Sequence, residues 1–472
     1  MAMVRMSLPT RLAYGFGSVA YGVNNNGLDY FLLIFYSQVL GVDAPLVGLA
    51  LLLALVFDSL SDPLVGYLSD NTHSRWGRRH PWMYAAALPV AAAYFMLWAP
   101  PAELSGNELF PYLFGLAVVV RTLITLYEVP ASALIAELTD EYDERTSLVS
   151  LRYFFGWAGG TIMATVALAV FLVPTETLSS GLMNRQGYAT YGMAASVVIL
   201  VSILVASLGT HSHIPHLRAP PPKTRFELRR IYRELYETLS SRSFLALFVS
   251  TILGAVAAGL AAGLNFYVSG YFWEFSTDQI AVLSVSIIAS AFLALFIAPI
   301  VSRRLGKKRG AIIVGVIAFS TAPAPVALRL LGVMPQNGDP ILFPIILVTT
   351  VLDVALIITT QILGTSMVAD LVEESEIRTS RRSEGVFFAA MTFTRKAVQG
   401  FGVLAATGVL ALVSFPKGVA PGLVPEETLF RLGAWYASSL FVIWMLMIAC
   451  LRFYRIDRGQ HEDNLRTLAS RG

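Results

Sequence analysis

Asp58 and Asp62 lie four residues apart in the apolar stretch 46–68. In a helix, this spacing places both carboxylates on one face. Two like charges in an apolar setting repel each other, and a hard cation such as Na⁺, or a proton on one carboxylate, relieves that repulsion. The pair therefore predicts a cation or proton site. A charge at a helix end is the alternative, because Asp62 precedes Pro63.

A third acidic residue, Glu128, follows Thr125 by three residues in a later apolar stretch. The Thr125 hydroxyl can share the face of Glu128, and Pro130 frees a backbone carbonyl one turn back. These oxygens could complete a cage with the aspartates of stretch 46–68. The alternative for Glu128 is a structural ion pair with Arg121 or Arg152.

The first apolar stretch, 12–40, carries side-chain amides as well as a carboxylate. Asn25, Asn26 and Asp29 share a helix face with Gly22. So much amide is unusual in an apolar helix and suits a substrate that forms hydrogen bonds. Hydrogen bonding between helices is the alternative.

Charges inside apolar stretches are functional candidates by default, since a charge at a bilayer centre costs about 2.5–3.5 kcal/mol. Arg395 and Lys396 are neighbours and would point about 100° apart on a helix, so only one needs to face a cavity. The full set is Asp29, Asp58, Asp62, Glu128 and Asp353 with Arg121, Arg152, Arg395 and Lys396.

These residues sit in a chain whose composition excludes a soluble protein. Of the 472 residues, 56% are hydrophobic and 14% charged, whereas soluble domains carry roughly 25% charged residues. Continuous apolar runs argue against a β-barrel. A phosphate-binding Gly-Lys-Ser/Thr loop is missing, which argues against an ATP-driven pump. The apolar runs fall at 12–40, 46–68, 82–100, 110–136, 148–173, 188–210, 244–272, 279–301, 311–331, 341–369, 386–415 and 429–453.

The distribution of basic residues predicts how these runs are oriented across the membrane. Most of the 34 Lys and Arg fall in the N-terminus, alternate loops, the stretch 211–243 and the C-terminal tail. The other loops hold only Arg185, Arg329, Lys417 and Arg431. By the positive-inside rule, both termini lie in the cytoplasm.

Short basic loops recur at 70–79 and 302–310, at equivalent places in the two halves. The sequence therefore predicts an all-α membrane protein with twelve transmembrane helices in two six-helix bundles, the major facilitator fold. We expect the bundles at 1–210 and 244–456, a cytoplasmic linker with an amphipathic helix at 211–243, and a cytoplasmic tail at 457–472.

Four stretches resemble the glycoside–pentoside–hexuronide:cation symporters, the family that contains the melibiose permease. They are 12–17, 58–82, 128–154 and 368–396. The resemblance implies a symporter, not an enzyme, that couples entry of a small solute to Na⁺, or to H⁺ or Li⁺, by alternating access. It implies a monomer in the bacterial inner membrane, without a nucleic-acid partner.

The resemblance also implies site residues. Position by position, the cation ligands would be Asp58, Asp62, Ser61, Thr125 and Glu128. The resemblance places Glu128, Arg152 and Lys396 at the substrate site. The helix face described above adds Gly22, Asn25, Asn26 and Asp29 to the expected substrate site. Charged residues near the cytoplasmic loops would latch the outward-open state, with solvated loop charge as the alternative; these are Arg75, Arg78, Asp140, Arg145 and Arg378.

Two positions depart from the family pattern. Gly22 stands where the permease has a sugar-binding Asp, and Ser132 stands where it has a Trp. Sodium-dependent lysophospholipid symporters of the same superfamily also lack that Asp. The expected solute is therefore a glycoside or related sugar, and a lysophospholipid or other amphipathic solute is the alternative.

Overall fold

The computed structural model describes residues 6–139, 142–176, 178–216, 242–379 and 384–455. Over these ranges the regular secondary structure is helical, apart from one isolated bridge between Thr175 and Leu178, and loops connect the helices. The expected amphipathic helix of the linker and the expected tail lie outside the described residues.

The N-terminal half, taken here as 6–211, begins with a broken helix. Its pieces are α1 (Leu8–Phe16), α2 (Ser18–Asn26), η1 (Gly27–Phe31), α3 (Leu32–Ile34) and η2 (Phe35–Val39). The following elements are α4 (Ala44–Asp70), α5 (His80–Trp98), η3 (Gly106–Leu109), α6 (Phe110–Leu138), α7 (Tyr142–Val166), η4 (Ala167–Phe171), η5 (Gly181–Met183) and α8 (Arg185–His211).

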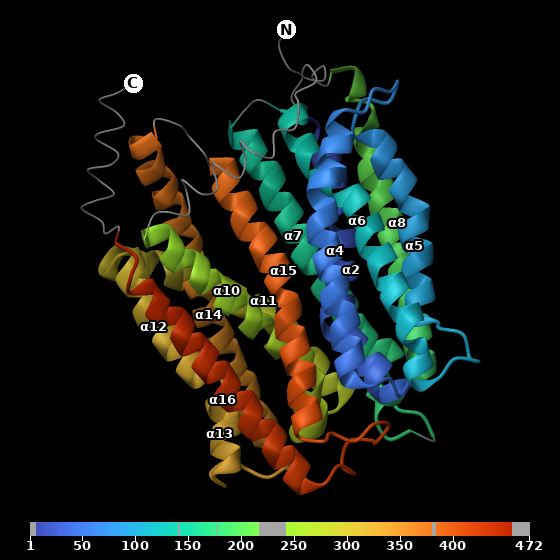
Figure 1. The fold of residues 1–472 in the computed structure, drawn as a ribbon, viewed down its shortest axis with the longest axis vertical. Helices are drawn as coiled ribbons and strands as arrows, with labels where there is room; N and C mark the ends of the chain where they lie inside the picture. Colours follow the sequence, from blue (N-terminus) through green and yellow to red (C-terminus); the bar gives the residue numbers. More distant parts are fainter. Residues whose placement is uncertain (1–5, 140–141, 177, 217–241, 380–383, 456–472) are drawn as a thin grey trace.

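The C-terminal half, 242–455, follows the short η6 (Ile214–His216). It comprises α10 (Arg242–Phe266), η7 (Tyr267–Phe272), α11 (Thr277–Leu305), α12 (Lys307–Thr321), α13 (Ala324–Leu330), α14 (Leu342–Thr379), α15 (Glu384–Leu412) and α16 (Glu426–Leu451). Figure 1 shows α2 to α8 grouped on one side of the molecule and α10 to α16 on the other.

The chain is a multi-span membrane protein. Among the described residues, ten helices are long and apolar enough to cross a membrane. The apolar part of α15, Val398–Leu412, is shorter, and the first apolar run is divided into the pieces given above. Twelve crossings and cytoplasmic termini remain predictions.

The first run is not the continuous helix that its apolar pattern predicts. Two wide π-type turns, η1 and η2, interrupt it. Gly27 opens η1 where the chain passes closely over Tyr94 and Tyr191: a Cβ there would lie 2.0 Å and 2.7 Å from their hydroxyl oxygens. A side chain larger than hydrogen would therefore push this segment away from α5 and α8, and Asp29 would move with it.

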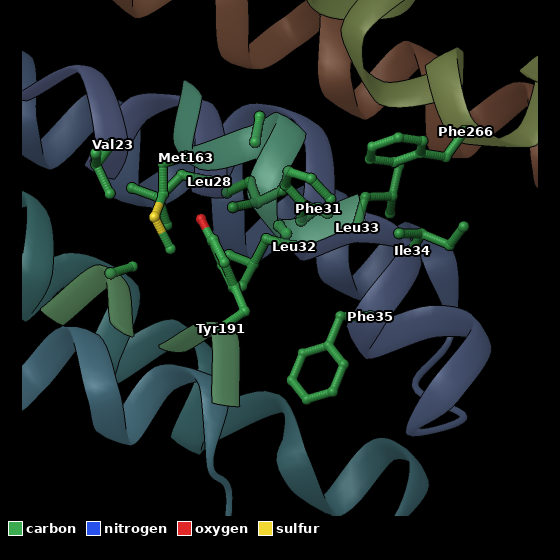
Figure 2. Close-up of a cluster of buried hydrophobic side chains, with 14 of the residues drawn as sticks. Val23, Leu28, Phe31, Leu32, Leu33, Ile34, Phe35, Met163, Tyr191 and Phe266 are labelled. Carbon is green, nitrogen blue, oxygen red and sulfur yellow. The ribbon is translucent and has the colours of Figure 1, made fainter. Parts of the chain in front are cut away.

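The two halves meet along α4 with α15 and α7 with α11. Glycines permit the first contact: Gly48 packs on Thr407, and Gly400 packs on Leu52. Figure 2 shows the segment from Leu28 to Phe35 lying between Tyr191 of the N-terminal half and Phe266 of the C-terminal half. The rings of Phe31 and Phe266 are 4.8 Å apart, so the buried core continues across the boundary.

Local sequence signals place the ends of several helices. Ser276 and Gln279 form a reciprocal capping box that starts α11. Gly306 ends α11 with a φ of 75°, a left-handed conformation that favours glycine. Because α12 begins immediately afterwards, Gly306 forms the turn between the two helices and Lys307 is the first residue of α12.

Candidate functional site

Asp58 and Asp62 of α4 converge on one hydroxyl of α6. Thr125 Oγ1 lies 2.7 Å from Asp58 Oδ1 and 3.1 Å from Asp62 Oδ1. Asp58 is only 3% exposed. A hydroxyl carries a single proton, so it cannot donate a full hydrogen bond to both carboxylates at once. The arrangement brings the oxygens of two carboxylates and one hydroxyl together.

Arg121 of α6 lies between Asp58 and Asp29. Its Nη1 is 3.8 Å from Asp58 Oδ2, and its Nη2 is 3.6 Å from Asp29 Oδ1. Both separations exceed hydrogen-bond length, so these contacts act through charge. Gln399 of α15 donates from Nε2 to the other oxygen of Asp29, at 3.2 Å. Polar contacts thus extend from α4 through α6 and η1 into the C-terminal half.

A second cluster lies one turn along α6. Arg152 of α7 donates from Nη2 to Glu128 Oε1 and from Nη1 to the Tyr14 hydroxyl at 3.1 Å. Tyr14 in turn donates to the Ala131 carbonyl at 2.7 Å. Glu128 therefore forms the ion pair that was the alternative to a cation cage. Its Oε2 is buried and has no hydrogen-bond partner in the described part of the chain.

Other expected ligands lie differently. Ser61 donates its hydroxyl to the backbone carbonyl of Asp58, at 2.9 Å, within its own helix. Gly22 packs against α7, where an added Cβ would lie 1.9 Å from the Gly156 carbonyl oxygen. Gly22 thus lies where α2 and α7 pack closely. A residue with a Cβ would collide with α7 there, which explains the glycine.

The side-chain amides of the first apolar run have different neighbours. Asn24 donates to Asn25 Oδ1 at 3.4 Å, while Asn26 lies against Gly160 of α7. Asp29 faces Arg121 and Gln399 instead. The spacing predicts one shared face, but Asn26 and Asp29 lie against different helices, because the π-type turn η1 begins between them.

Four expected residues lack a described side chain. Lys396 lies in α15, Arg145 in α7 and Arg378 in α14, but the structure describes only their backbone. Asp140 lies outside the described residues. Their roles in substrate binding and gating stay predictions.

The end of the molecule that carries Arg78, Arg79 and Lys307, here called the basic end, has ion pairs within each half. Arg78 and Arg79 both contact Glu137 Oε1, at 2.8 Å and 2.9 Å. Lys307 contacts Asp370 at 2.5 Å. Arg78 thus finds an acidic partner, but in its own half. Arg75, the other described member of the expected latch, lies over the Trp76 ring.

The opposite end, which carries Asp43, Asn107 and Lys417 and is here called the far end, has contacts between halves. Lys417 forms an ion pair with Asp43, and Tyr267 hydrogen-bonds to Ser37. The Lys417 ammonium, together with the Asn107 amide, holds the pKa of Asp43 below its ordinary value. Sequence reasoning missed this link because nothing local connects two loops so distant in the chain.

Comparison with known proteins identifies the family. The family profile described as "MFS/sugar transport protein" matches residues 13–458, nearly the whole chain. The chain belongs to this family. It is therefore a transporter of the major facilitator superfamily (MFS) and not an enzyme, and the resemblance seen in the sequence is confirmed.

Curated relatives of this MFS family member are symporters and transporters. It is 26% identical to the inner membrane symporter YicJ of Escherichia coli, over 84% of this chain and 81% of that one. It is 23% identical to the isoprimeverose transporter of Lactiplantibacillus pentosus, over 95% and 88%. It is also 24% identical to the mouse sodium-dependent lysophosphatidylcholine symporter 1, over 98% and 88%.

Solved structures support the MFS fold. A D-xylose–proton symporter superposes with a TM-score of 0.65 at 14% identity, covering 95% of this chain and 97% of that chain. The nucleoside transporter NupG superposes with a TM-score of 0.63 at 14% identity, covering 93% and 99%. The match extends over both halves, as an MFS architecture requires.

Proposed function

We propose that this transporter is a symporter of the bacterial inner membrane that couples uptake of a glycoside or related sugar to a monovalent cation. The observation that carries the proposal is the convergence of Asp58 and Asp62 on Thr125. Two like charges that share one proton donor, one buried (Asp58) and one partly buried (Asp62), are stabilised by an added positive charge.

The coupling ion is a substrate of this site. Carboxylate and hydroxyl oxygens are the ligands that hard cations such as Na⁺ and Li⁺ prefer. A proton on either aspartate would relieve the same repulsion, so the chemistry suits H⁺ as well. Relatives that include a sodium-dependent symporter favour Na⁺ as the first ion to test.

The solute site would adjoin Glu128 and Arg152. Oε2 of Glu128 is a buried acceptor without a partner among the described residues, and it suits a sugar hydroxyl. Tyr14 is buried beneath Arg152 and helps to hold the guanidinium in place beside Glu128. Since Thr125 and Glu128 lie three residues apart on one face of α6, a cation at Thr125 would help to fix Glu128 for the solute.

Alternating access would follow from the two halves. In this structure the halves are linked at the far end through Lys417 and Asp43. At the basic end, the described ion pairs stay within each half. Rocking of one half against the other around the central carboxylates would exchange these ends, as in other transporters with repeated halves.

A lysophospholipid or other amphipathic molecule is the second candidate solute. Tyr153, Phe154 and Trp157 follow Arg152 on α7 and are all largely exposed. These exposed aromatic rings give α7 an apolar surface that suits an acyl chain. The mouse relative transports such a class by name.

The test compares Asp58→Asn with Asp353→Asn in proteoliposomes. Asp353 is a matched control because it is also a buried carboxylate, held by Thr321 in the C-terminal half. Uptake of radiolabelled isoprimeverose, melibiose and lysophosphatidylcholine is measured with and without gradients of Na⁺ and H⁺. We expect Asp58→Asn to lower cation-driven uptake roughly 100-fold, the scale for losing a charged ligand worth about 3 kcal/mol.

Asp353→Asn should keep most of the cation-driven uptake. Full cation-driven uptake by Asp58→Asn would contradict the site assignment. Uptake of lysophosphatidylcholine but of neither sugar would favour the second candidate solute.

A further inference from the structure

Arg121 is a buried cation placed almost midway between two carboxylates. It is 5% exposed, and its terminal nitrogens lie 3.8 Å from Asp58 and 3.6 Å from Asp29. Its Nε is also buried and lacks a hydrogen-bond partner in the described ranges. The guanidinium is thus held between Asp58 and Asp29 by charge, without the short directional bonds that arginine usually makes to carboxylates.

Other buried arginines of the N-terminal half are held differently. Arg152 donates to Glu128 and to Tyr14. Arg79 donates to Ser69 at 2.7 Å and to Glu137 at 2.9 Å. Such bonds fix a guanidinium in one position. The looser contacts of Arg121 allow it to move toward either carboxylate with little loss of bonding.

A cation bound by Asp58, Asp62 and Thr125 would change this balance. Asp58 is a member of that trio and also faces Arg121, so the bound cation and the guanidinium would compete for the same carboxylate. Like charges at short range repel strongly in a buried setting. Cation binding would therefore displace Arg121 toward Asp29, which lies on its other side.

We propose that Arg121 is a resident counter-charge of the cation site: it pairs with Asp58 when the site is empty and moves to Asp29 when the cation binds. The inference rests on the proposed symport function and deepens it. Asp29 also accepts a hydrogen bond from Gln399 of α15. The position of Arg121 would therefore alter a contact between the two halves, and so couple site occupancy to their arrangement.

The competition predicts effects of opposite sign for two variants. Arg121→Gln removes the competitor, so the cation should bind more tightly. Asp29→Asn removes the alternative partner and leaves Arg121 attached to Asp58, so the cation should bind more weakly. A merely structural role of this ion-pair network would instead weaken binding in both variants, because each would disturb the same packing.

The experiment titrates the purified full chain with NaCl, LiCl or protons alone and follows the thermal unfolding temperature. Choline chloride keeps the ionic strength constant. The wild-type protein is titrated first, and an absence of any cation response there would overturn the proposed function itself. With the ion that stabilises the wild type, we expect the half-saturating concentration to fall about tenfold in Arg121→Gln and to rise about tenfold in Asp29→Asn.

Arg121→Lys keeps the positive charge and should stay near the wild-type value. It also serves as the second variant if Arg121→Gln does not fold. Weaker or unchanged binding in folded Arg121→Gln, or tighter or unchanged binding in Asp29→Asn, would overturn the inference. A half-saturating concentration in Arg121→Lys that falls tenfold would overturn it as well, since competition requires only the charge.

Discussion

Two clusters of charged side chains on α6 lie one helical turn apart and differ in how their charges are paired. Around Thr125, two aspartates share one hydroxyl, and Arg121 stays beyond hydrogen-bond distance. Around Glu128, the carboxylate and Arg152 pair directly, and Tyr14 ties the arginine to the backbone of α6. The first cluster holds two carboxylates on one hydroxyl, whereas the second pairs one carboxylate with one guanidinium.

This difference separates two tasks. A site that must bind and release a small cation works best when its ligands are preassembled but incompletely satisfied. A site that must present a fixed surface to a solute works best when its charged groups are already locked by one another. In the proposed symporter, the spacing of three residues between Thr125 and Glu128 would join both tasks on one helix.

The sharpest way to test this contrast is to remove one carboxylate from each cluster. Glu128→Gln leaves the Arg152 charge without its partner, which costs about 3 kcal/mol on the scale for breaking a buried ion pair. Asp62→Asn removes one of two repelling charges and should leave stability unchanged or higher. Thermal unfolding in detergent without Na⁺ or Li⁺ measures both, and equal losses would show that the two clusters do not differ in this way.

Thr125→Val tests the shared hydroxyl. The substitution keeps the shape of the side chain but removes the oxygen that both aspartates approach. We expect cation affinity to fall about tenfold, the effect of losing roughly 1.4 kcal/mol. Thr125→Ser keeps the hydroxyl and should retain most of the affinity in isothermal titration. Normal binding by Thr125→Val would remove Thr125 from the ligand set.

Ser61→Ala should have the smallest effect. The Ser61 hydroxyl donates to the carbonyl of Asp58 within α4, so it is already engaged with its own backbone. We expect the half-saturating cation concentration to change less than about twofold, within the surface-like range of a few tenths of a kcal/mol. A tenfold loss in the same titration would instead support the ligand role that the family resemblance implies for Ser61.

The sequence alone predicted those features that depend on short-range spacing. Asp58 and Asp62 share a face because four residues make about one helical turn, and α4 is regular over that range. The apolar runs likewise predicted the long helices, since bilayer thickness and helix rise set their length. Thr125 was predicted to face these aspartates, and the structure brings the three together.

Features that depend on packing between distant segments were not predicted. Arg121 was considered only as a partner of Glu128, but α6 and η1 pack so that it faces Asp29. The sequence predicted no contact for Gln399 or Lys417, because their partners lie in the other half of the chain. Gly22 was assigned to a substrate surface, although the close approach of α2 and α7 explains the residue.

The ion pair between Lys417 and Asp43 has a consequence for the speed of the cycle. The two side chains are 46% and 40% exposed, so water and salt screen their attraction to about 1 kcal/mol or less. Thermal motion breaks a contact of that strength readily, so this ion pair by itself would add little to the barrier for parting the far end. A buried pair at the same place would turn each opening into a slow, activated event. The exposed pair thus makes turnover sensitive to the ionic strength of the surrounding fluid.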